Sequence, residues 1–114
     1  MSNRLQQLTE FLKENPADPF LAYALATEYL KLGQTEEALR HYEQLVHEHP
    51  DYVGTYYHLG KLYESLGRHA EAVTTYENGM QAARNKRDMH ALSELQGAYH
   101  LAMGDDEEED DEDF

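Results

Sequence analysis

The side chains with the most evident chemistry in this sequence are its seven histidines, three of which lie in the segment HYEQLVHEH. Imidazole is a common zinc ligand, but a zinc site needs several ligands that converge on one ion. His47 and His49 are two residues apart, so a helix would point them to different sides, and His41 lies about two helical turns before His49. The spacing therefore predicts solvated surface histidines, and we expect neither a metal site nor a cofactor.

The motifs that mark nucleophilic or phosphate chemistry are missing from the sequence. It contains no Walker-type phosphate loop, no Gly-x-Gly-x-x-Gly turn, no Gly-x-Ser-x-Gly elbow and no His-Glu-x-x-His pair. Cysteine is also absent, which excludes thiolate catalysis and disulfides and suits a reducing cytoplasm. We therefore expect no enzymatic activity and no catalytic residues. A metal-dependent enzyme is the least supported alternative, and a zinc titration would test it.

The charge of the chain divides into two parts. Nine carboxylates lie in DDEEEDDED, residues 105–113, whereas residues 1–104 carry fourteen carboxylates against nine lysines and arginines, a net charge of −5. An acidic surface repels phosphates, so we expect neither nucleic acid nor an anionic membrane as a partner. The N-terminal segment lacks the features of a secretion signal and no apolar stretch is long enough to span a bilayer, so we expect a cytoplasmic protein.

An internal repeat predicts the elements that carry these side chains. The segment YLKLGQTEEALRHYEQLVHEHP, residues 29–50, returns in altered form thirty-four residues later as YESLGRHAEAVTTYENGMQAAR, residues 63–84. The matched positions are small, apolar or aromatic, whereas most other positions differ. They pair Leu25 with Leu59, Ala26 with Gly60, Tyr29 with Tyr63, Gly33 with Gly67, Ala38 with Ala72 and Tyr42 with Tyr76. A repeat of this length indicates a supersecondary unit that buries its apolar face against the next copy.

Each copy predicts two helices that are joined at a glycine. In the first copy, a helical face over residues 22–32 is followed by Gly33, which can take the positive φ that ends a helix. A second helical face covers residues 38–46, with Thr35 as its expected N-cap and Pro50 just beyond its end. Small residues at the matched positions would let the helix axes approach, and the matched tyrosines would fill the space between neighbouring hairpins.

The repeat resembles the motif of the tetratricopeptide repeat family, which has the same length. The matching residues are Leu25, Ala26, Tyr29, Gly33, Ala38, Tyr42 and Pro50 in the first repeat, and Tyr56, Leu59, Gly60, Tyr63, Gly67, Ala72 and Tyr76 in the second. Gly79 and Arg84 depart from the motif, which has alanine and proline there. The resemblance implies an all-α fold, a right-handed superhelix of antiparallel helices, with two full repeats at about 19–52 and 53–86.

The flanking segments fit the same scheme and complete about six helices. Residues 3–15 resemble the second helix of a preceding repeat, although Arg4 stands where the motif has alanine. Residues 88–103 resemble a terminal capping helix with Asp88 as its N-cap. The full set of predicted helices is 3–15, 19–32, 35–48, 53–66, 69–85 and 88–103, within a domain that covers residues 1–104.

Residues 105–114 are predicted to be a disordered acidic tail, because adjacent carboxylates repel one another and offer no apolar surface to bury. Such a tail keeps a protein soluble. The alternative is that it contacts a basic partner or the cationic residues Arg84, Lys86 and Arg87.

The resemblance also implies where a partner would bind. In this family the first helix of each repeat lines a concave groove, and Tyr23 and Tyr57 occupy the same place on those helices. Exposed aromatic rings beside a few cations supply the rigid area and the charge that a peptide-binding surface needs. The candidate groove residues are Phe20, Tyr23, Thr27, Leu30, Lys31, Tyr57, Lys61 and Glu64. The alternative is that flanking helices bury these rings.

The predicted function is therefore protein–protein interaction, with a peptide or a helix of a partner in the groove. Some members of the family grip a C-terminal carboxylate with a lysine and asparagines, but the asparagines are missing here, so this specificity is not predicted. The alternative function is self-association through the last helix, near Leu92, Leu95, Tyr99 and Met103. We expect a monomer or a weak homodimer.

Overall fold

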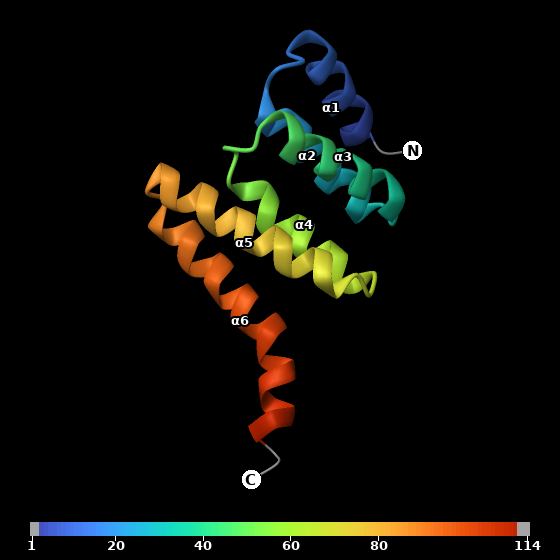
Figure 1. Cartoon of the computed structure of the whole chain (residues 1–114). Helices are drawn as coiled ribbons and strands as arrows, with labels where there is room; N and C mark the ends of the chain where they lie inside the picture. The colour runs from blue at the N-terminus through green and yellow to red at the C-terminus, as the bar shows by residue number, and fades with distance from the viewer. Residues whose placement is uncertain (1–2, 112–114) are drawn as a thin grey trace. The chain divides into compact units, whose positions relative to one another are not determined.

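The computed structural model of the protein describes the backbone of residues 3–111 and the side chains of residues 3–104. This backbone forms helices and turns, without a strand, which confirms the predicted all-α fold (Figure 1). The helices are α1 (Asn3–Glu14), α2 (Pro19–Lys31), α3 (Thr35–Glu48), α4 (Gly54–Ser65), α5 (His69–Lys86) and α6 (Met89–Asp111). None of them, over the part of the chain that the structure describes, is long and apolar enough to cross a membrane.

The chain divides into two compact units, Met1–Tyr52 and Val53–Phe114. In the first unit, α2 packs against both α1 and α3. In the second unit, α5 packs against both α4 and α6, and α4 also contacts α6. Each unit thus contains one predicted repeat together with its neighbouring flanking helix. The right-handed stacking of the two repeats stays a prediction.

The turn inside each repeat has the predicted glycine geometry. Gly33 and Gly67 have φ values of 78° and 75°, a region that glycine enters without the steric cost of a Cβ atom. The residue after each glycine donates its backbone N–H to the carbonyl oxygen five residues earlier, Gln34 to Tyr29 at 2.9 Å and Arg68 to Tyr63 at 2.8 Å. This pattern satisfies carbonyls that the end of a helix leaves without an intrahelical partner.

The turn between α5 and α6 uses the same geometry without a glycine. Arg87 has a φ of 59°, and the N–H of Asp88 donates to the carbonyl oxygen of Ala83 at 2.9 Å. A residue with a Cβ atom is strained in this left-handed conformation. The sequence gives no glycine to mark this turn, and α5 ends one residue later than the predicted bound at 85.

One of the two predicted N-caps is confirmed by the structure. The carboxylate of Asp88 accepts the backbone N–H of Ala91 at 3.0 Å, which confirms its predicted N-cap role. The prediction for Thr35 is wrong, because Thr35 is the first residue of α3 and Gln34 precedes it without a side-chain cap. Asp18, which caps α2 by accepting the N–H of Phe20 at 2.9 Å, was not predicted.

The core of the first unit lies where α2 meets its two neighbours. Tyr42 of α3 and Ala26 of α2 are fully buried, and Leu8 of α1 and Leu45 of α3 are also buried. The departure of Arg4 from the motif has a structural reason, because its guanidinium lies 3.7 Å from the largely buried carboxylate of Glu28 on α2. An ion pair of this kind offsets part of the cost of burying a carboxylate.

The core of the second unit depends on two glycines inside helices. A Cβ atom at Gly60 of α4 would lie 2.2 Å from the ring of Tyr76 on α5. A Cβ atom at Gly79 of α5 would lie 2.5 Å from the Cβ of Tyr56 and 3.1 Å from Leu95 of α6. Small residues therefore let the helices approach, as predicted, and Gly79 departs from the motif because α4 and α6 both approach α5 there.

The matched tyrosines only partly fill the space that the sequence predicts for them. Tyr42 and Tyr76 are fully buried, but Tyr76 lies on Gly60 within its own hairpin. Tyr63 is buried, whereas Tyr29 is only half-buried and its ring centroid lies 4.9 Å from that of His41. These tyrosines therefore also hold the two helices of a hairpin together. The ring of Tyr76, for example, fills the space that the missing side chain of Gly60 leaves.

The last helix is longer than predicted. The structure continues α6 through Asp111, where the sequence predicted a helix that ends at 103 and a disordered tail over 105–114. Adding a residue to an existing helix fixes one residue for one hydrogen bond, which costs far less than starting a helix. Residues 112–114 lie outside the described residues. Figure 1 shows that α6 leads away from the α5–α6 turn, so its far end is not beside the cations of that turn.

Candidate partner-binding surface

The predicted groove residues of the first repeat lie on α2. Phe20 is 58% exposed and Lys31 is also exposed, whereas Tyr23, Thr27 and Leu30 are half-buried. Two of these five are fixed by a residue of α3, because the hydroxyl groups of Thr27 and Tyr42 form a hydrogen bond of 2.8 Å. The ring of Tyr23 lies beside Tyr42 as well, with centroids 6.3 Å apart.

Tyr52 is the residue of this surface that sequence reasoning missed. Its ring centroid lies 5.9 Å from that of Tyr23, at an interplanar angle of 55°. Tyr23 therefore lies between two other rings, in the tilted geometry that aromatic pairs prefer. Burial raises the pKa of the Tyr42 hydroxyl, although its hydrogen bond with Thr27 opposes this shift. Burial raises the pKa of Tyr52 too, so both hydroxyls stay protonated at neutral pH.

The predicted groove residues of the second repeat lie on α4 and form a chain of contacts. The Lys61 ammonium lies 5.7 Å from the centroid of the Tyr57 ring, within the range of a cation–π interaction. The same ammonium lies 4.0 Å from the carboxylate of Glu64. Tyr57 is half-buried and Lys61 is exposed, so this part of α4 presents an aromatic ring and a positive charge to solvent.

A buried tyrosine of the neighbouring helix α5 fixes the position of Glu64. The hydroxyl of Tyr76 on α5 donates a hydrogen bond to the carboxylate of Glu64. Burial raises the pKa of Tyr76 far above its usual value, and the hydrogen bond to Glu64 raises it further. The same oxygen of Glu64, Oε2, therefore accepts from the neutral phenol and lies 4.0 Å from the Lys61 ammonium.

Tyr42 and Tyr76 are equivalent positions of the two repeats, but they hold different residues of the candidate surface. The partner of Tyr42 is Thr27, whereas the partner of Tyr76 is Glu64. The repeat offset places Lys61 at the position of Thr27. The second repeat has no hydroxyl group at this position, and the phenol of Tyr76 donates instead to Glu64, one helical turn further along. The predicted surface thus stays within each repeat, and its continuity over both repeats stays a prediction.

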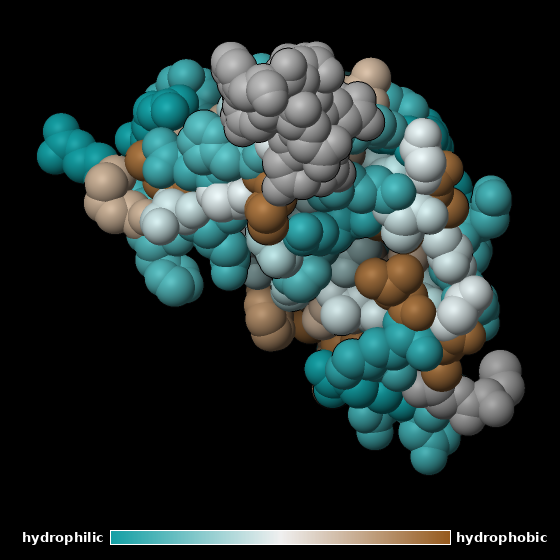
Figure 2. Space-filling model, turned by 90° about the horizontal axis from the view of Figure 1, so that it is seen from below, coloured by the Kyte–Doolittle hydropathy of each residue, from teal (hydrophilic) through white to brown (hydrophobic). Residues whose placement is uncertain are grey.

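Exposed apolar side chains are few and scattered over the described residues. Figure 2 shows them as separate small patches on a face that is otherwise mostly hydrophilic. The large exposed apolar residues are Phe11, Phe20, Leu32, Leu66, Met89 and Leu101. Of the residues predicted for self-association, Leu95 is 1% exposed and is thus part of the core, whereas Leu101, which was not predicted, is 71% exposed.

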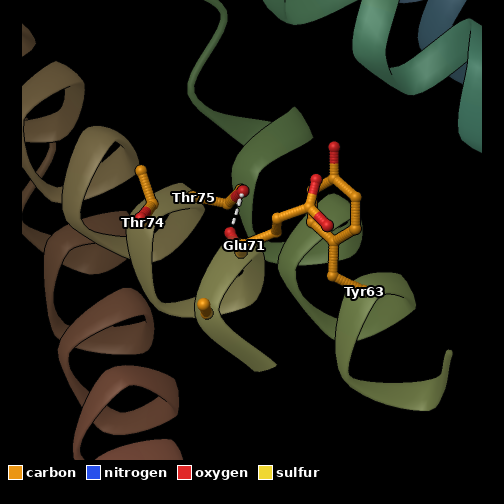
Figure 3. A pocket seen from close by; sticks show the side chains of 5 residues that line it. Tyr63, Glu71, Thr74 and Thr75 are labelled. Atoms are coloured by element: carbon orange, nitrogen blue, oxygen red, sulfur yellow. Dashed lines mark hydrogen bonds between the residues drawn. The ribbon is translucent and has the colours of Figure 1, made fainter. Parts of the chain in front are cut away.

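The second unit contains an open pocket of about 300 Å³ between α4 and α5, which Figure 3 shows from close by. Tyr63, Ala70, Glu71, Thr74 and Thr75 line it. The Thr75 hydroxyl donates to the backbone carbonyl of Glu71 at 2.7 Å, and the Glu71 carboxylate forms two hydrogen bonds with Arg68, at 2.6 and 2.8 Å. This ion pair lowers the pKa of Glu71, so its carboxyl is not poised as a general acid or base.

The first unit contains a second pocket, of about 260 Å³, which was not predicted. It lies between α1, the turn that follows it, α2 and α3, and its lining residues are Leu12, Pro16, Ala22, His41, Gln44, Leu45, Glu48 and His49. His41 donates its Nδ1–H to the backbone carbonyl of Glu37 at 2.8 Å.

The histidines do not gather with carboxylates around a common point. Within residues 3–104 there is no group of three or more histidine, aspartate or glutamate residues that could hold a metal ion. His58 of α4 is half-buried, and this burial lowers its pKa, although Glu94 of α6 opposes the shift.

Comparisons with known proteins agree with this geometry. Residues 23–88 match the tetratricopeptide repeat family. A tetratricopeptide repeat domain protein from Salinibacter ruber, known from a crystal structure, is 53% identical; the match covers 76% of this chain and 97% of that chain, with a TM-score of 0.74. A protein from Bordetella parapertussis, known from a solution structure, is 25% identical over 93% of this chain and 92% of its own, with a TM-score of 0.77.

A curated relative extends the comparison in sequence. A TPR repeat-containing protein of Pseudomonas aeruginosa is 28% identical over 91 residues, which cover 80% of this chain and 87% of that protein. The repeat spacing, the glycine turns, the buried tyrosines and these matches lead to one conclusion. The chain belongs to the tetratricopeptide repeat family, with the all-α solenoid type of fold that the sequence predicted.

Proposed function

We propose that this protein binds a peptide or a helix of a partner protein through the concave groove that the sequence predicts, with residues of α2 and α4 as its lining. Tetratricopeptide repeats in general mediate protein–protein interaction, and the family match supports that class of function here. The proposed surface consists of Phe20, Tyr23, Thr27, Leu30 and Lys31 on α2, and of Tyr57, Lys61 and Glu64 on α4.

The observation that supports the proposal is the partial burial and the ring contacts of the two equivalent tyrosines, Tyr23 and Tyr57. Both rings are half-buried, and both are held by neighbours, Tyr23 by two other rings and Tyr57 by the ammonium of Lys61. A ring that is already ordered loses little conformational entropy when a partner covers its exposed face. Held aromatic rings beside a cation are typical of positions that contribute most of the energy of an interface.

The chemistry of the surface favours a protein partner over other classes. The surface has two lysines, of which Lys61 lies 4.0 Å from the carboxylate of Glu64, and the chain as a whole has a net charge of −14. This net negative charge repels the phosphates of nucleic acids and of anionic membranes. An extended peptide or an amphipathic helix with an apolar residue for the tyrosines and an acidic residue for Lys61 would suit it.

Peptide selection from a random displayed library tests the proposal without knowledge of the natural partner. We expect the selected peptides to lose about tenfold or more in affinity on Tyr57→Ala, and less on Lys61→Gln, because the ring supplies the larger contact area. Glu77→Gln, an exposed change on α5, is the matched control. Far-ultraviolet circular dichroism checks that each variant keeps its helices. Peptides whose affinity is the same for Tyr57→Ala and for the control would contradict the proposal.

Self-association through α6 is the second candidate function, and Leu101 is the observation that favours it. This side chain is 71% exposed on a helix in which Leu95, Ala98 and Ala102 are buried within the unit, whereas Met89 is 59% exposed. An exposed leucine of this kind is a possible contact with a second copy, and its test is the oligomeric state, as discussed below.

A further inference from the structure

We propose that the pocket of the first unit between α1, α2 and α3 binds an arginine side chain of a partner protein. This site does not rest on the proposed surface of α2 and α4, because it consists of a different set of residues.

The size of the pocket suits one side chain. Its volume is about 260 Å³, which is below the range of about 300–1,000 Å³ that is usual for pockets that take a drug-sized ligand. Half of its lining residues are apolar, namely Leu12 of α1, Ala22 of α2, Leu45 of α3 and Pro16. Apolar lining residues can cover the three methylene groups of a long side chain whose end is polar.

The polar groups of the lining include several hydrogen-bond acceptors that have no partner within the pocket lining. The side-chain amide of Gln44 donates to the carboxylate Oε2 of Glu48 at 3.0 Å, so the other oxygen of Glu48 and the Oε1 of Gln44 stay available as acceptors. His41 donates its Nδ1–H to the carbonyl of Glu37, so its Nε2 in the neutral ring is also an acceptor. A ligand that is rich in donors could therefore use these acceptors together.

The charge of the lining also favours a cationic ligand, because it includes the carboxylate of Glu48. Among the residues whose side chains the structure describes, no lysine or arginine lies within ion-pair distance of the Glu48 carboxylate. The first unit carries nine carboxylates against four lysines and arginines, a net charge of −5. It therefore attracts a cationic ligand, as do the acidic residues 105–113 of the second unit, and the pocket must select the ligand by its shape and its hydrogen bonds as well.

Arginine fits these requirements better than lysine. Its guanidinium has five N–H donors and no acceptor, and it is planar, so it can lie on an imidazole ring while it donates to a carboxylate and an amide oxygen. An ammonium has three donors around one point and would leave some of these acceptors unused.

Nuclear magnetic resonance titration with the amide of N-acetyl-arginine tests the site in the full chain. We expect backbone amide shifts at Gln44, Leu45, Glu48 and His49, with an affinity on the order of millimolar for so small a ligand. The amide of N-acetyl-citrulline has nearly the same shape without the charge, and we expect it to bind several-fold more weakly. Equal binding of the two probes, or shifts that do not gather at the pocket, would overturn the proposal.

Two variants of α3 separate the pocket from the general charge of the unit. Glu48→Gln removes the carboxylate and is expected to weaken the arginine probe about two- to fivefold. Glu36→Gln removes the same charge from an exposed residue of the same helix outside the pocket, and it is expected to leave the affinity unchanged. Equal losses in both variants would show attraction by net charge alone and would contradict the site.

We do not expect Glu48→Gln to weaken the binding of the arginine probe by unfolding the protein. Glu48 is exposed at the end of α3, where a negative charge is unfavourable next to the carbonyl end of the helix. The variant is therefore expected to unfold at the same urea concentration as the wild type or at a slightly higher one. Failure of the proposed α2 and α4 surface would leave these results unchanged, because the titration reports on a different set of residues.

Discussion

Gly60 and Gly97 are both helical glycines of the second unit, but their surroundings differ. A Cβ atom at Gly60 would lie 2.2 Å from the ring of Tyr76, whereas a Cβ atom at Gly97 would have no atom within 4 Å. We expect Gly60→Ala to lower the free energy of unfolding by about 1–3 kcal/mol, because the buried ring must move. Gly97→Ala should raise it by about 0.5–1 kcal/mol through helix propensity.

Urea unfolding followed by circular dichroism measures both changes at once, provided that the slope of the transition stays the same. Gly97→Ala is the control, because it makes the same chemical change at an open position of the same unit. A Gly60→Ala variant as stable as the wild type would mean that α4 and α5 do not pack as closely as described.

Tyr76 makes the stability of the protein depend on pH in the alkaline range. In the folded state its pKa is raised, by burial first and by the Glu64 hydrogen bond second, whereas the unfolded chain releases the proton near pH 10. Above that pH the unfolded state binds fewer protons than the folded state. The free energy of unfolding therefore falls as pH rises, by up to about 1.4 kcal/mol per pH unit.

Tyr76→Phe tests this dependence, because phenylalanine has no proton to release. We expect a loss of about 1 kcal/mol at neutral pH from the missing hydrogen bond, and a smaller decline of stability between pH 10 and pH 11 than in the wild type. Urea unfolding at a series of pH values gives both quantities. Parallel declines in the two proteins would show that Tyr76 is not protected in the folded state.

At the scale of single residues, the sequence predicted burial better than partners. The repeat predicted that Tyr42 and Tyr76 pack inside the fold, because equivalent positions of two copies meet the same core. It could not predict that one hydroxyl binds Thr27 and the other Glu64, since hydrogen bonds depend on which oxygen the neighbouring helix places within reach. Tyr52 was missed because it lies in a turn, outside the repeated helical faces.

At the scale of elements, the turn between α5 and α6 has an arginine, Arg87, at the position where the turns inside the two repeats have a glycine. Arg87 holds a left-handed conformation that Gly33 and Gly67 adopt without strain. We expect Arg87→Gly to stabilise the protein by about 0.5–1 kcal/mol, because the relief of strain exceeds the added freedom of the unfolded chain. Thermal unfolding in a calorimeter or by circular dichroism measures the difference.

The opposite change at Gly67 is the companion experiment. Its φ is 75° and a Cβ atom would meet nothing within 4 Å, so the cost of Gly67→Ala is conformational alone. It should destabilise the protein by about 1–2 kcal/mol. If Arg87→Gly lowered the stability as well, the Arg87 side chain would have to make a contact that outweighs its strain.

Helix positions were predictable from the sequence to within a residue or two, but some of their ends were not. Gly33 and Gly67 marked two ends because no other residue suits their backbone, whereas the turn at Arg87 and the end of α6 carry no such signal. Thr35 has the side chain of an N-cap but lies one residue inside α3. The identity of a residue thus indicates a cap only when the backbone places it just outside the helix.

At the scale of the whole molecule, net charge opposes self-association. The chain carries a net charge of −14, so two copies repel each other unless salt screens them. We expect a monomer at low ionic strength and, at about 1 M salt, at most a weak dimer that Leu101→Ser abolishes. Sedimentation equilibrium over a range of concentrations tests this. A stable dimer at low salt would contradict the expectation and favour assembly as the function.

The sequence supported the family and the class of function, and it predicted the candidate surface only in part. Tyr23, Thr27, Tyr57, Lys61 and Glu64 were predicted because the repeat gives equivalent helices and the family resemblance implies which side of them lines a groove. The arginine pocket could not be found in this way, since Leu12, Ala22 and Glu48 come from three helices that no periodicity connects.

The buried tyrosines Tyr42 and Tyr76 have different hydrogen-bond partners, so the packing inside a hairpin is compatible with different residues on its surface. Each phenol needs only one oxygen from the adjoining helix, and either the threonine of one copy or the glutamate of the other supplies it. Thr27→Lys combined with Leu30→Glu would therefore graft the exterior of the later copy onto the earlier one, while leaving the interior intact. The two copies thus keep equivalent buried tyrosines while they present different side chains to solvent.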